Sequence, residues 1–178
     1  VGFVAQLTPI DFTPKPFPDL NESTDAELVD HLISPSAVYR QHSQFEILRR
    51  GVSDIRATSL LALADDDSAP LYGRVAAIYT IKQLLGSGAN GALLRLLADD
   101  TVREFALRAL TDRKSDLDKL PLEPFVAALK DKNPRVRGQA LISIGRLGRP
   151  EAGEAILPLS VRSTGYPKPT AEPLYKQA

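Results

Sequence analysis

The segment DKNPRVRGQALISIGRLG, residues 131–148, contains a turn, the body of a helix and the end of that helix. Asp131 and Pro134 mark the turn. After them, apolar residues recur in steps of three and four, as on one face of a helix: Val136, Ala140, Leu141, Ile144 and Leu147. Gly148 then stands where helices commonly end in a left-handed conformation. The segment therefore predicts an amphipathic helix that ends at this glycine.

Three further segments align with this one on an arginine: AVYRQHSQFEILRRG, LYGRVAAIYTIKQLLG and DTVREFALRALTD. The aligned residues are Arg40, Arg74, Arg103 and Arg137, separated by 34, 29 and 34 residues. Three positions later stand the small residues Ser43, Ala77, Ala106 and Ala140, and seven positions later the aliphatic residues Ile47, Ile81, Leu110 and Ile144. Gly51, Gly86 and Gly148 close three of the segments, and only the third copy lacks a glycine. This pattern predicts helices that approach closely and fill one another's layers.

A shorter apolar segment precedes each of these helices: TDAELVDHLI, DIRATSLLALA, NGALLRLLA and LEPFVAALKD. Thr24 and Glu27 form a capping-box pattern at the start of the first one. We find no alternating apolar pattern that would predict a strand. The repeated unit is helix, turn, helix over about 30 to 34 residues, which is typical of a solenoid. The predicted fold is all-α, an α-α superhelix of about four helix pairs, with PEAGEAILPLS opening a partial fifth.

Residues 131–148 resemble the consensus of HEAT repeats, in which Asp and Pro in a turn are followed by V-R, A-L, aliphatic residues and glycine. The first copy departs most, with Tyr39 for valine, Ser43 for alanine and Gln44 where leucine stands in later copies. The resemblance covers about residues 23–162. It implies a HEAT-like solenoid that acts as a non-catalytic scaffold or protein-interaction module, with a protein partner or neighbouring domains of the same chain.

Proline-rich segments flank the repeats. Prolines at 9, 14, 16 and 18 predict an extended linker over residues 1–22, and prolines at 167, 169 and 173 predict an irregular tail over residues 163–178. The repeat domain is expected between them, at 23–162. Because the chain begins at Val1, contains no Met and stops inside a fifth unit, we expect a piece of a longer protein.

Residues 18–51, PDLNESTDAELVDHLISPSAVYRQHSQFEILRRG, are similar to a region of large planctomycete-type proteins described as membrane-bound dehydrogenases. In that family a β-propeller precedes HEAT repeats and a c-type haem module with CxxCH follows them. This resemblance implies that the chain is the helical connector of a multidomain redox protein, with an exported or periplasmic location. The chemistry would then belong to the neighbouring domains.

Composition excludes several classes of site. The formal net charge is zero and the pI about 6.9, so no global basic field favours nucleic acid. The absence of cysteine removes disulfides, thiolate metal sites and cysteine nucleophiles. No apolar run reaches the ~18 residues of a membrane span. A basic patch remains, formed by Lys132, Arg135, Arg137, Arg146 and Arg149. We expect Arg137 to pair with a turn acid such as Asp131.

The segment GSGANG, residues 86–91, matches the dinucleotide-binding pattern G-x-G-x-x-G, but the predicted element before it is a helix and not a strand. A helix cap followed by a turn is the favoured interpretation. Asp65, Asp66 and Asp67 lack the glycine and distal glutamate of a calcium loop, and His31 and His42 have no third ligand at a suitable spacing. We therefore predict no cofactor, no metal and no catalytic residue, and we expect that this part of the protein is not an enzyme.

If the second helix of each pair lines the concave wall, the positions five past each arginine lie away from the core: Phe45, Tyr79, Arg108 and Ile142. With Arg49 and Arg146 beside them, they are the predicted partner-binding residues. The aromatic residues have an alternative role, filling the seams between helices. Two other functions stay open, a HEAT-like bilin lyase and a HEAT-like DNA-repair glycosylase, although the chain lacks the tryptophans expected of the latter.

Overall fold

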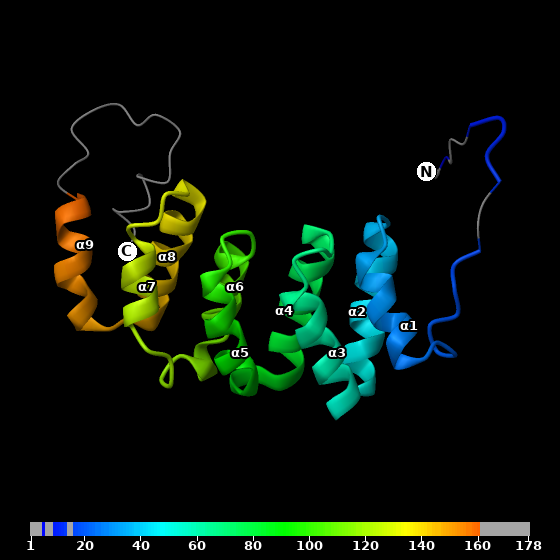
Figure 1. Ribbon diagram of the computed structural model, residues 1–178, viewed down its shortest axis with the longest axis horizontal. Helices are drawn as coiled ribbons and strands as arrows, with labels where there is room; N and C mark the ends of the chain where they lie inside the picture. Colours follow the sequence, from blue (N-terminus) through cyan, green and yellow to red (C-terminus); the bar gives the residue numbers. More distant parts are fainter. Residues whose placement is uncertain (1–4, 6–8, 14–15, 161–178) are drawn as a thin grey trace, which may run out of the picture.

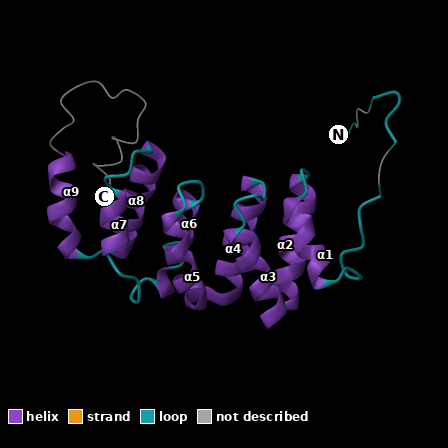
Figure 2. Cartoon of the chain, viewed as in Figure 1, coloured by secondary structure: helices purple, strands orange, loops and turns teal. Residues whose placement is uncertain are grey.

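The structure, a computed structural model, describes residues 5, 9–13 and 16–160. These residues form helices joined by turns and contain no strand, which confirms the predicted all-α class (Figure 2). The predicted tail at 163–178 lies outside the described residues. In the N-terminal part that is described, residues 9–13 and 16–23 contain no helix or strand. The division into linker, repeat domain and tail stays a prediction.

The helices stack in pairs, side by side, along a curved row (Figure 1). In the described part of the chain the pairs are α1 (Asp25–Asp30) with α2 (Ala37–Arg50), α3 (Asp54–Asp65) with α4 (Leu71–Leu85), α5 (Asn90–Arg95) with α6 (Arg103–Leu110), and α7 (Glu123–Ala128) with α8 (Pro134–Leu147), followed by α9 (Gly153–Ser160). Short 3-10 segments are η1 (His31–Ile33), η2 (Gly86–Ala89), η3 (Leu96–Ala98), η4 (Lys114–Asp116) and η5 (Pro150–Ala152). This is the predicted α-α solenoid of four pairs and a partial fifth. We call α1, α3, α5, α7 and α9 the first helices, and α2, α4, α6 and α8 the second helices.

The repeated apolar positions form the core. All four small residues, Ser43, Ala77, Ala106 and Ala140, are 0% exposed. The four aliphatic residues one turn later, Ile47, Ile81, Leu110 and Ile144, are at most 2% exposed. Each layer is therefore closed by the same two positions of every second helix, as the sequence pattern predicts.

Glycines end three of the second helices. The φ angles of Gly51, Gly86 and Gly148 are 76°, 56° and 61°, in the left-handed region where a side chain would be strained. Gly86 is thus the cap of α4, as predicted, and no strand precedes it in the described chain. The third second helix, α6, ends without a glycine and is followed by a longer connection that contains η4.

The repeat arginines turn back onto the end of the first helix of their own pair or onto the turn that follows it. The Arg74 side chain donates to the carbonyl of Ala64 through Nε and Nη2, at 3.0 and 2.9 Å. Arg103 donates in the same way to the carbonyls of Leu97 and Ala98. Arg40 and Arg137 also bind carbonyls in the turn before their helix, Arg40 those of Ser34 and Pro35. The arginine thus supplies donors to carbonyls that the end of a helix leaves without partners.

Two of these arginines also reach the turn of the following pair. Arg74, whose side chain is 2% exposed, forms an ion pair of 2.6 Å with Asp99, and Arg103 forms one with Asp131. Arg40 lies over the ring of Tyr72 instead, 4.5 Å from its centroid. The expected pairing of Arg137 with the Asp131 carboxylate is wrong, because Arg103 occupies that carboxylate. Arg137 donates to the main-chain carbonyl of Asp131 at 3.0 Å.

The two sides of the array are packed differently. Neighbouring second helices contact one another, and side chains bridge their seams: Gln44 donates to Thr80 Oγ1 at 2.9 Å, and Thr111 and Ser143 share a hydrogen bond of 2.9 Å. Between first helices lie grooves of about 310 Å³ (α3 to α5) and about 340 Å³ (α5 to α7). The closer spacing of the second helices places them on the inner side of the curve in this part of the array.

Replacing Ala140 with Asp is expected to destabilise the whole array. The side chain is fully buried, so a carboxylate there enters an apolar layer without a partner, at a cost of about 3 kcal/mol or more. The thermal midpoint measured by circular dichroism should fall by roughly 10 °C or more. Ala62→Asp, at an exposed position of α3, is the control. An unchanged midpoint for Ala140→Asp would contradict the register described above.

Candidate functional site

The six residues predicted for partner binding all lie on second helices, and four of them form one row across α2, α4, α6 and α8. Phe45 is 57% exposed and Ile142 39% exposed, and Arg108 is exposed between them. The Arg49 and Arg146 side chains, 64% and 44% exposed, lie one turn further along α2 and α8. We call this surface the second-helix wall. Its role in binding stays a prediction.

Tyr79 is the member of the row that faces the seam most. It is half-buried, and its hydroxyl is buried without a hydrogen-bond partner among the described residues. Burial raises the pKa of Tyr79, and the nearby charge of Arg108 offsets this only in part. Tyr79 therefore fills the seam between α4 and α6, the alternative role considered for the aromatic positions, and exposes only part of its ring to the wall.

Arg49 belongs to a charged cluster at the end of α2. Its Nε and Nη2 donate to the two carboxylate oxygens of Glu46, each at 2.6 Å, and Arg50 Nε donates to the same carboxylate at 2.7 Å. Glu46 is 8% exposed. The hydrogen bonds from Arg49, and then those from Arg50, lower the pKa of Glu46 from 4.5 to about 2.

The same cluster holds the N-terminal segment against the first repeat. Arg50 Nη2 donates to the carbonyls of Leu20 and Asn21, at 2.9 and 3.1 Å, and Nη1 donates to Asp25. Arg56 of α3 binds the same Asp25 carboxylate at 2.8 Å. Sequence analysis missed this cluster, since neither Arg50 nor Arg56 occupies a repeated position.

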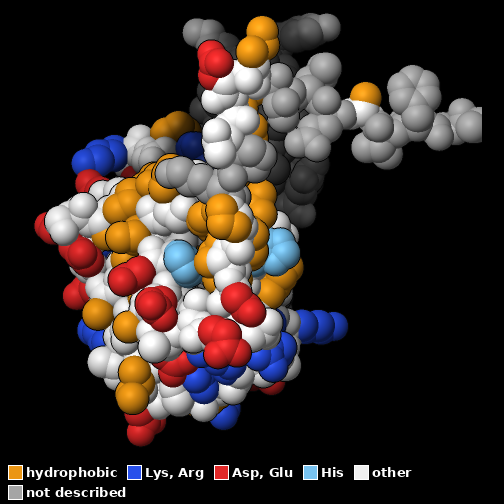
Figure 3. All heavy atoms as spheres, turned by 90° about the vertical axis from the view of Figure 1, so that its right-hand side faces the viewer, with side chains coloured by type: hydrophobic (Ala, Val, Ile, Leu, Met, Phe, Trp, Pro, Cys, Tyr) orange, Lys and Arg blue, Asp and Glu red, His pale blue; other side chains and the backbone are white. Residues whose placement is uncertain are grey.

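Aromatic side chains gather at the end of the array formed by the first pair. The Phe17 ring lies 4.9 Å from that of Tyr39 and 5.1 Å from that of His42, with the rings steeply inclined to each other. His42 is also 6.3 Å from Phe45. Figure 3 shows this end of the molecule, with hydrophobic side chains around the histidines. The histidines therefore pack against aromatic rings, and no group of three metal-ligating side chains occurs in the part of the chain that the structure describes.

The predicted basic patch is largely paired. Lys132 forms an ion pair of 2.7 Å with Asp100, and Arg135 one of 3.0 Å with Glu104. Arg146 donates to the carbonyl of Thr111 at 3.3 Å and lies 3.9 Å from Asp112. Arg149 donates to the carbonyl of Asp118. These contacts reduce the positive field of the patch, which weakens the case for a phosphate-binding surface.

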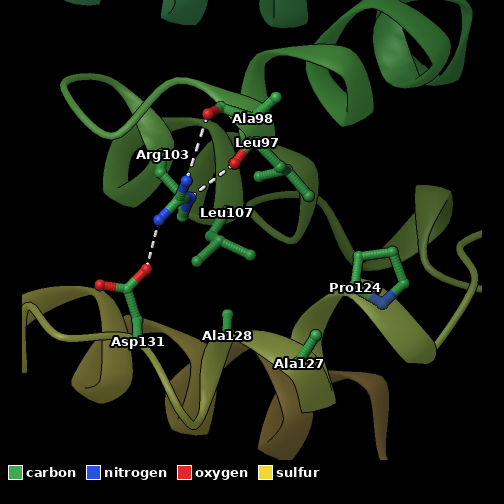
Figure 4. Close-up of a pocket in the computed structure, with 8 residues that line it drawn as sticks. All are labelled: Leu97, Ala98, Arg103, Leu107, Pro124, Ala127, Ala128 and Asp131. Atoms are coloured by element: carbon green, nitrogen blue, oxygen red, sulfur yellow. Dashed lines mark hydrogen bonds and ion pairs between the residues drawn. The ribbon is translucent and has the colours of Figure 1, made fainter.

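The residues that line the groove between α5 and α7 include no free catalytic group. Its floor is apolar, formed by Leu97, Leu107 and small side chains of α7, and its charged members are Arg103 and Asp131 (Figure 4). Both are engaged with each other, and Arg103 also binds two carbonyls. The groove can receive an apolar group but holds no unpaired acid, base or nucleophile among its lining residues.

A buried lysine, Lys82, lies near the C-terminal end of α4. Lys82, whose side chain is 2% exposed, donates to Asn90 at 2.8 Å and forms an ion pair of 2.9 Å with Asp116. The adjacent ammonium group of Lys82 lowers the pKa of Asp116. The contact attaches the long connection after α6 to α4. Sequence analysis missed it, because these residues lie outside the repeated pattern.

Comparison with known proteins gives one family. Residues 89–164 match the family model described as HEAT repeats. The match begins just before α5, so the later repeats are similar to HEAT repeats. Helices α1 to α4, which precede it, bury the same core positions. No curated protein matches the chain. No helix in the described ranges has the length and apolar character needed to cross a bilayer.

Replacing Glu46 with Gln is expected to lower the free energy of unfolding at pH 7 by about 2 kcal/mol, because charge-assisted hydrogen bonds to two arginines are lost. The native pKa is depressed, so the wild-type stabilisation is present above pH 4.5 and is lost as the pH falls towards 2. Urea unfolding of both proteins should therefore show a stability difference that shrinks as the pH falls through this window. An equal stability at pH 7 would contradict the role given to this cluster.

Proposed function

We propose that this chain is a non-catalytic HEAT-repeat scaffold whose second-helix wall contacts a protein partner or a neighbouring domain of the same polypeptide. One observation carries the proposal. Phe45 and Ile142 expose apolar side chains that the core does not need, because other residues of the second helices already fill it. Arg49 and Arg146 lie beside them. Exposed apolar side chains rimmed by arginine are typical of protein interfaces.

A non-catalytic role is favoured because the buried charged groups have structural partners. Arg74 binds Ala64 and Asp99, Lys82 binds Asn90 and Asp116, and Glu46 binds two arginines. Catalysis commonly requires a group that is perturbed and free to act on a substrate. The alternative of a HEAT-like bilin lyase predicts a shift of bilin absorbance on titration with the protein, and we expect no shift. The alternative of a HEAT-like repair glycosylase requires a basic cleft, whereas the basic patch here is paired with acids.

We also propose that the chain is part of a larger, multidomain redox protein, in which it connects other domains. The proposal rests on the similarity of residues 18–51 to the planctomycete-type dehydrogenases. The contact of Arg50 with Leu20 and Asn21 is compatible with a connector, since it fixes the direction in which the N-terminal segment leaves the first repeat. The family match covers the later repeats and does not bear on this proposal.

The double variant Phe45→Ala, Ile142→Ala is expected to lose the partner of the second-helix wall. The matched control is Ile55→Ala, since Ile55 is 70% exposed on α3, a first helix. Quantitative affinity purification from source cells should show a protein that is enriched on the wild type and the control but reduced about tenfold or more on the double variant. Equal recovery of every enriched protein on all three would contradict the proposal.

An immunoblot of source cells with an antibody to the repeats tests the multidomain proposal. We expect a band far above 19.3 kDa in envelope or exported fractions. A band near 19.3 kDa in the cytosol would overturn it and would leave a free-standing adaptor.

A further inference from the structure

Charge is divided between the two sides of the array. The second helices carry the acids Glu46 and Glu104, and every other charged residue in them is Arg or Lys. The first helices are mostly acidic, and their cations are Arg56 and Arg95. The net charge of the whole chain is zero, so this division is a property of the fold and not of the composition. The second helices together therefore carry positive charge, and the first helices together carry negative charge.

The acids on the second helices do not cancel the wall's positive charge. Glu46 is buried and bound by Arg49 and Arg50, and Glu104 is bound by Arg135. Arg108 stands at the centre of the row, is exposed and forms no ion pair with another described residue. The charge of its guanidinium group acts on Tyr79, whose pKa it lowers in part. The middle of the wall therefore presents an accessible guanidinium group without a carboxylate partner.

We infer that the second-helix wall binds an acidic polypeptide segment that also carries apolar side chains. This inference rests on the proposed function and names the chemistry of the partner. Acidic side chains of the segment meet Arg108, with Arg49 and Arg146 at either side, and apolar side chains cover Phe45 and Ile142. Charge complementarity across an interface of this kind steers association and fixes the register of the partner.

The spacing of the wall suits an extended segment that crosses the helices. Packed helices lie about 8–10 Å apart, and a segment in the extended polyproline II conformation advances about 3.1 Å per residue with three residues per turn, so that every third side chain lies on the same face. Every third residue of the segment therefore meets a new helix. The segment then presents four side chains at this interval. Apolar residues meet Phe45, Tyr79 and Ile142, and an acid meets Arg108.

Nucleic acid fits the same surface less well. Tight binding to a phosphate backbone needs many unpaired cations along one track. Arg49 and Arg146 of the wall, and Arg135 at the start of α8, already have carboxylates close by, and apolar side chains interrupt the row. A segment that offers both carboxylates and apolar groups matches this mixture, and the exposed ion pair of Arg146 with Asp112 exchanges partners at little cost.

The test uses a rhodamine-labelled, acidic peptide of about twelve residues, long enough to cross the four second helices at about 3.1 Å per residue. Leucines at its first, second and fourth contact positions, three residues apart, meet Phe45, Tyr79 and Ile142, an aspartate at the third meets Arg108, and the residues between them are Glu and Ser. Fluorescence anisotropy measures its binding to the full chain and to two variants. Arg108→Glu reverses the central charge of the wall. Arg95→Glu is the matched control, because Arg95 is an exposed arginine of α5, on the opposite side of the same helix pair.

We expect the acidic peptide to bind the wild type and Arg95→Glu alike, and to bind Arg108→Glu about tenfold or more weakly. The same peptide with lysine in place of its acids should not bind. Absence of binding by the acidic peptide, or equal binding to both variants, would overturn the inference. So would a thymidine oligonucleotide that binds the wall more tightly than the peptide does in the same salt.

The two proposals fail in different ways. If the acidic peptide does not bind but the Phe45→Ala, Ile142→Ala variant still loses a cellular partner, the wall is an interaction surface for another chemistry. If the peptide binds in the expected manner and that variant keeps every partner, the acidic preference holds and the proposed cellular role fails.

Discussion

A guanidinium group at the start of each second helix donates to carbonyls at the end of the preceding first helix or in the turn after it, and the solenoid depends on this contact. The first helices α1, α5 and α7 have six residues each, too few to be stable alone. Their last carbonyls have no partner within the helix. Arg40, Arg74, Arg103 and Arg137 supply donors in or next to these turns. Arg74 and Arg103 also bind an aspartate of the following turn, Asp99 and Asp131, and so tie consecutive pairs together.

This arrangement decides which charges are left for function. Arginines near the start of the second helices are used inside the array, and Glu46, Lys82 and Asp116 are paired at its other edge. Arginines further along the second helices project from the wall beside Phe45 and Ile142. In a solenoid each repeat stacks on its neighbours, and the outward faces of the second helices therefore form one continuous wall. The residues on this wall are not needed to fill the core. A surface of this kind suits recognition of a polypeptide better than it suits catalysis.

Sequence periodicity predicts the helices, their core positions and the glycine caps, because these depend on residues three, four and seven apart within one helix. It does not predict contacts between repeats. The carboxylate of Asp131 binds Arg103 and not Arg137, although Arg137 is nearer in the sequence. Stacking of the repeats brings Arg103 of the previous pair next to that carboxylate. Phe17, placed in a predicted linker, packs on Tyr39, and Lys82 binds Asp116 across a long connection. For the candidate site, the spacing predicts which positions face outward, but the half-burial of Tyr79 follows from packing between helices.

A double-mutant cycle on Arg74 and Asp99 tests most directly whether the arginine contacts hold the repeats in register. Urea unfolding would be measured for the wild type, Arg74→Met, Asp99→Asn and the double variant. Arg74 is 2% exposed and 2.6 Å from Asp99, so we expect a coupling free energy of about 1–3 kcal/mol. We also expect Arg74→Met to cost more than Asp99→Asn, because it leaves the Ala64 carbonyl without its donors. Additive single effects, or an Arg74→Met variant as stable as the wild type, would contradict this account.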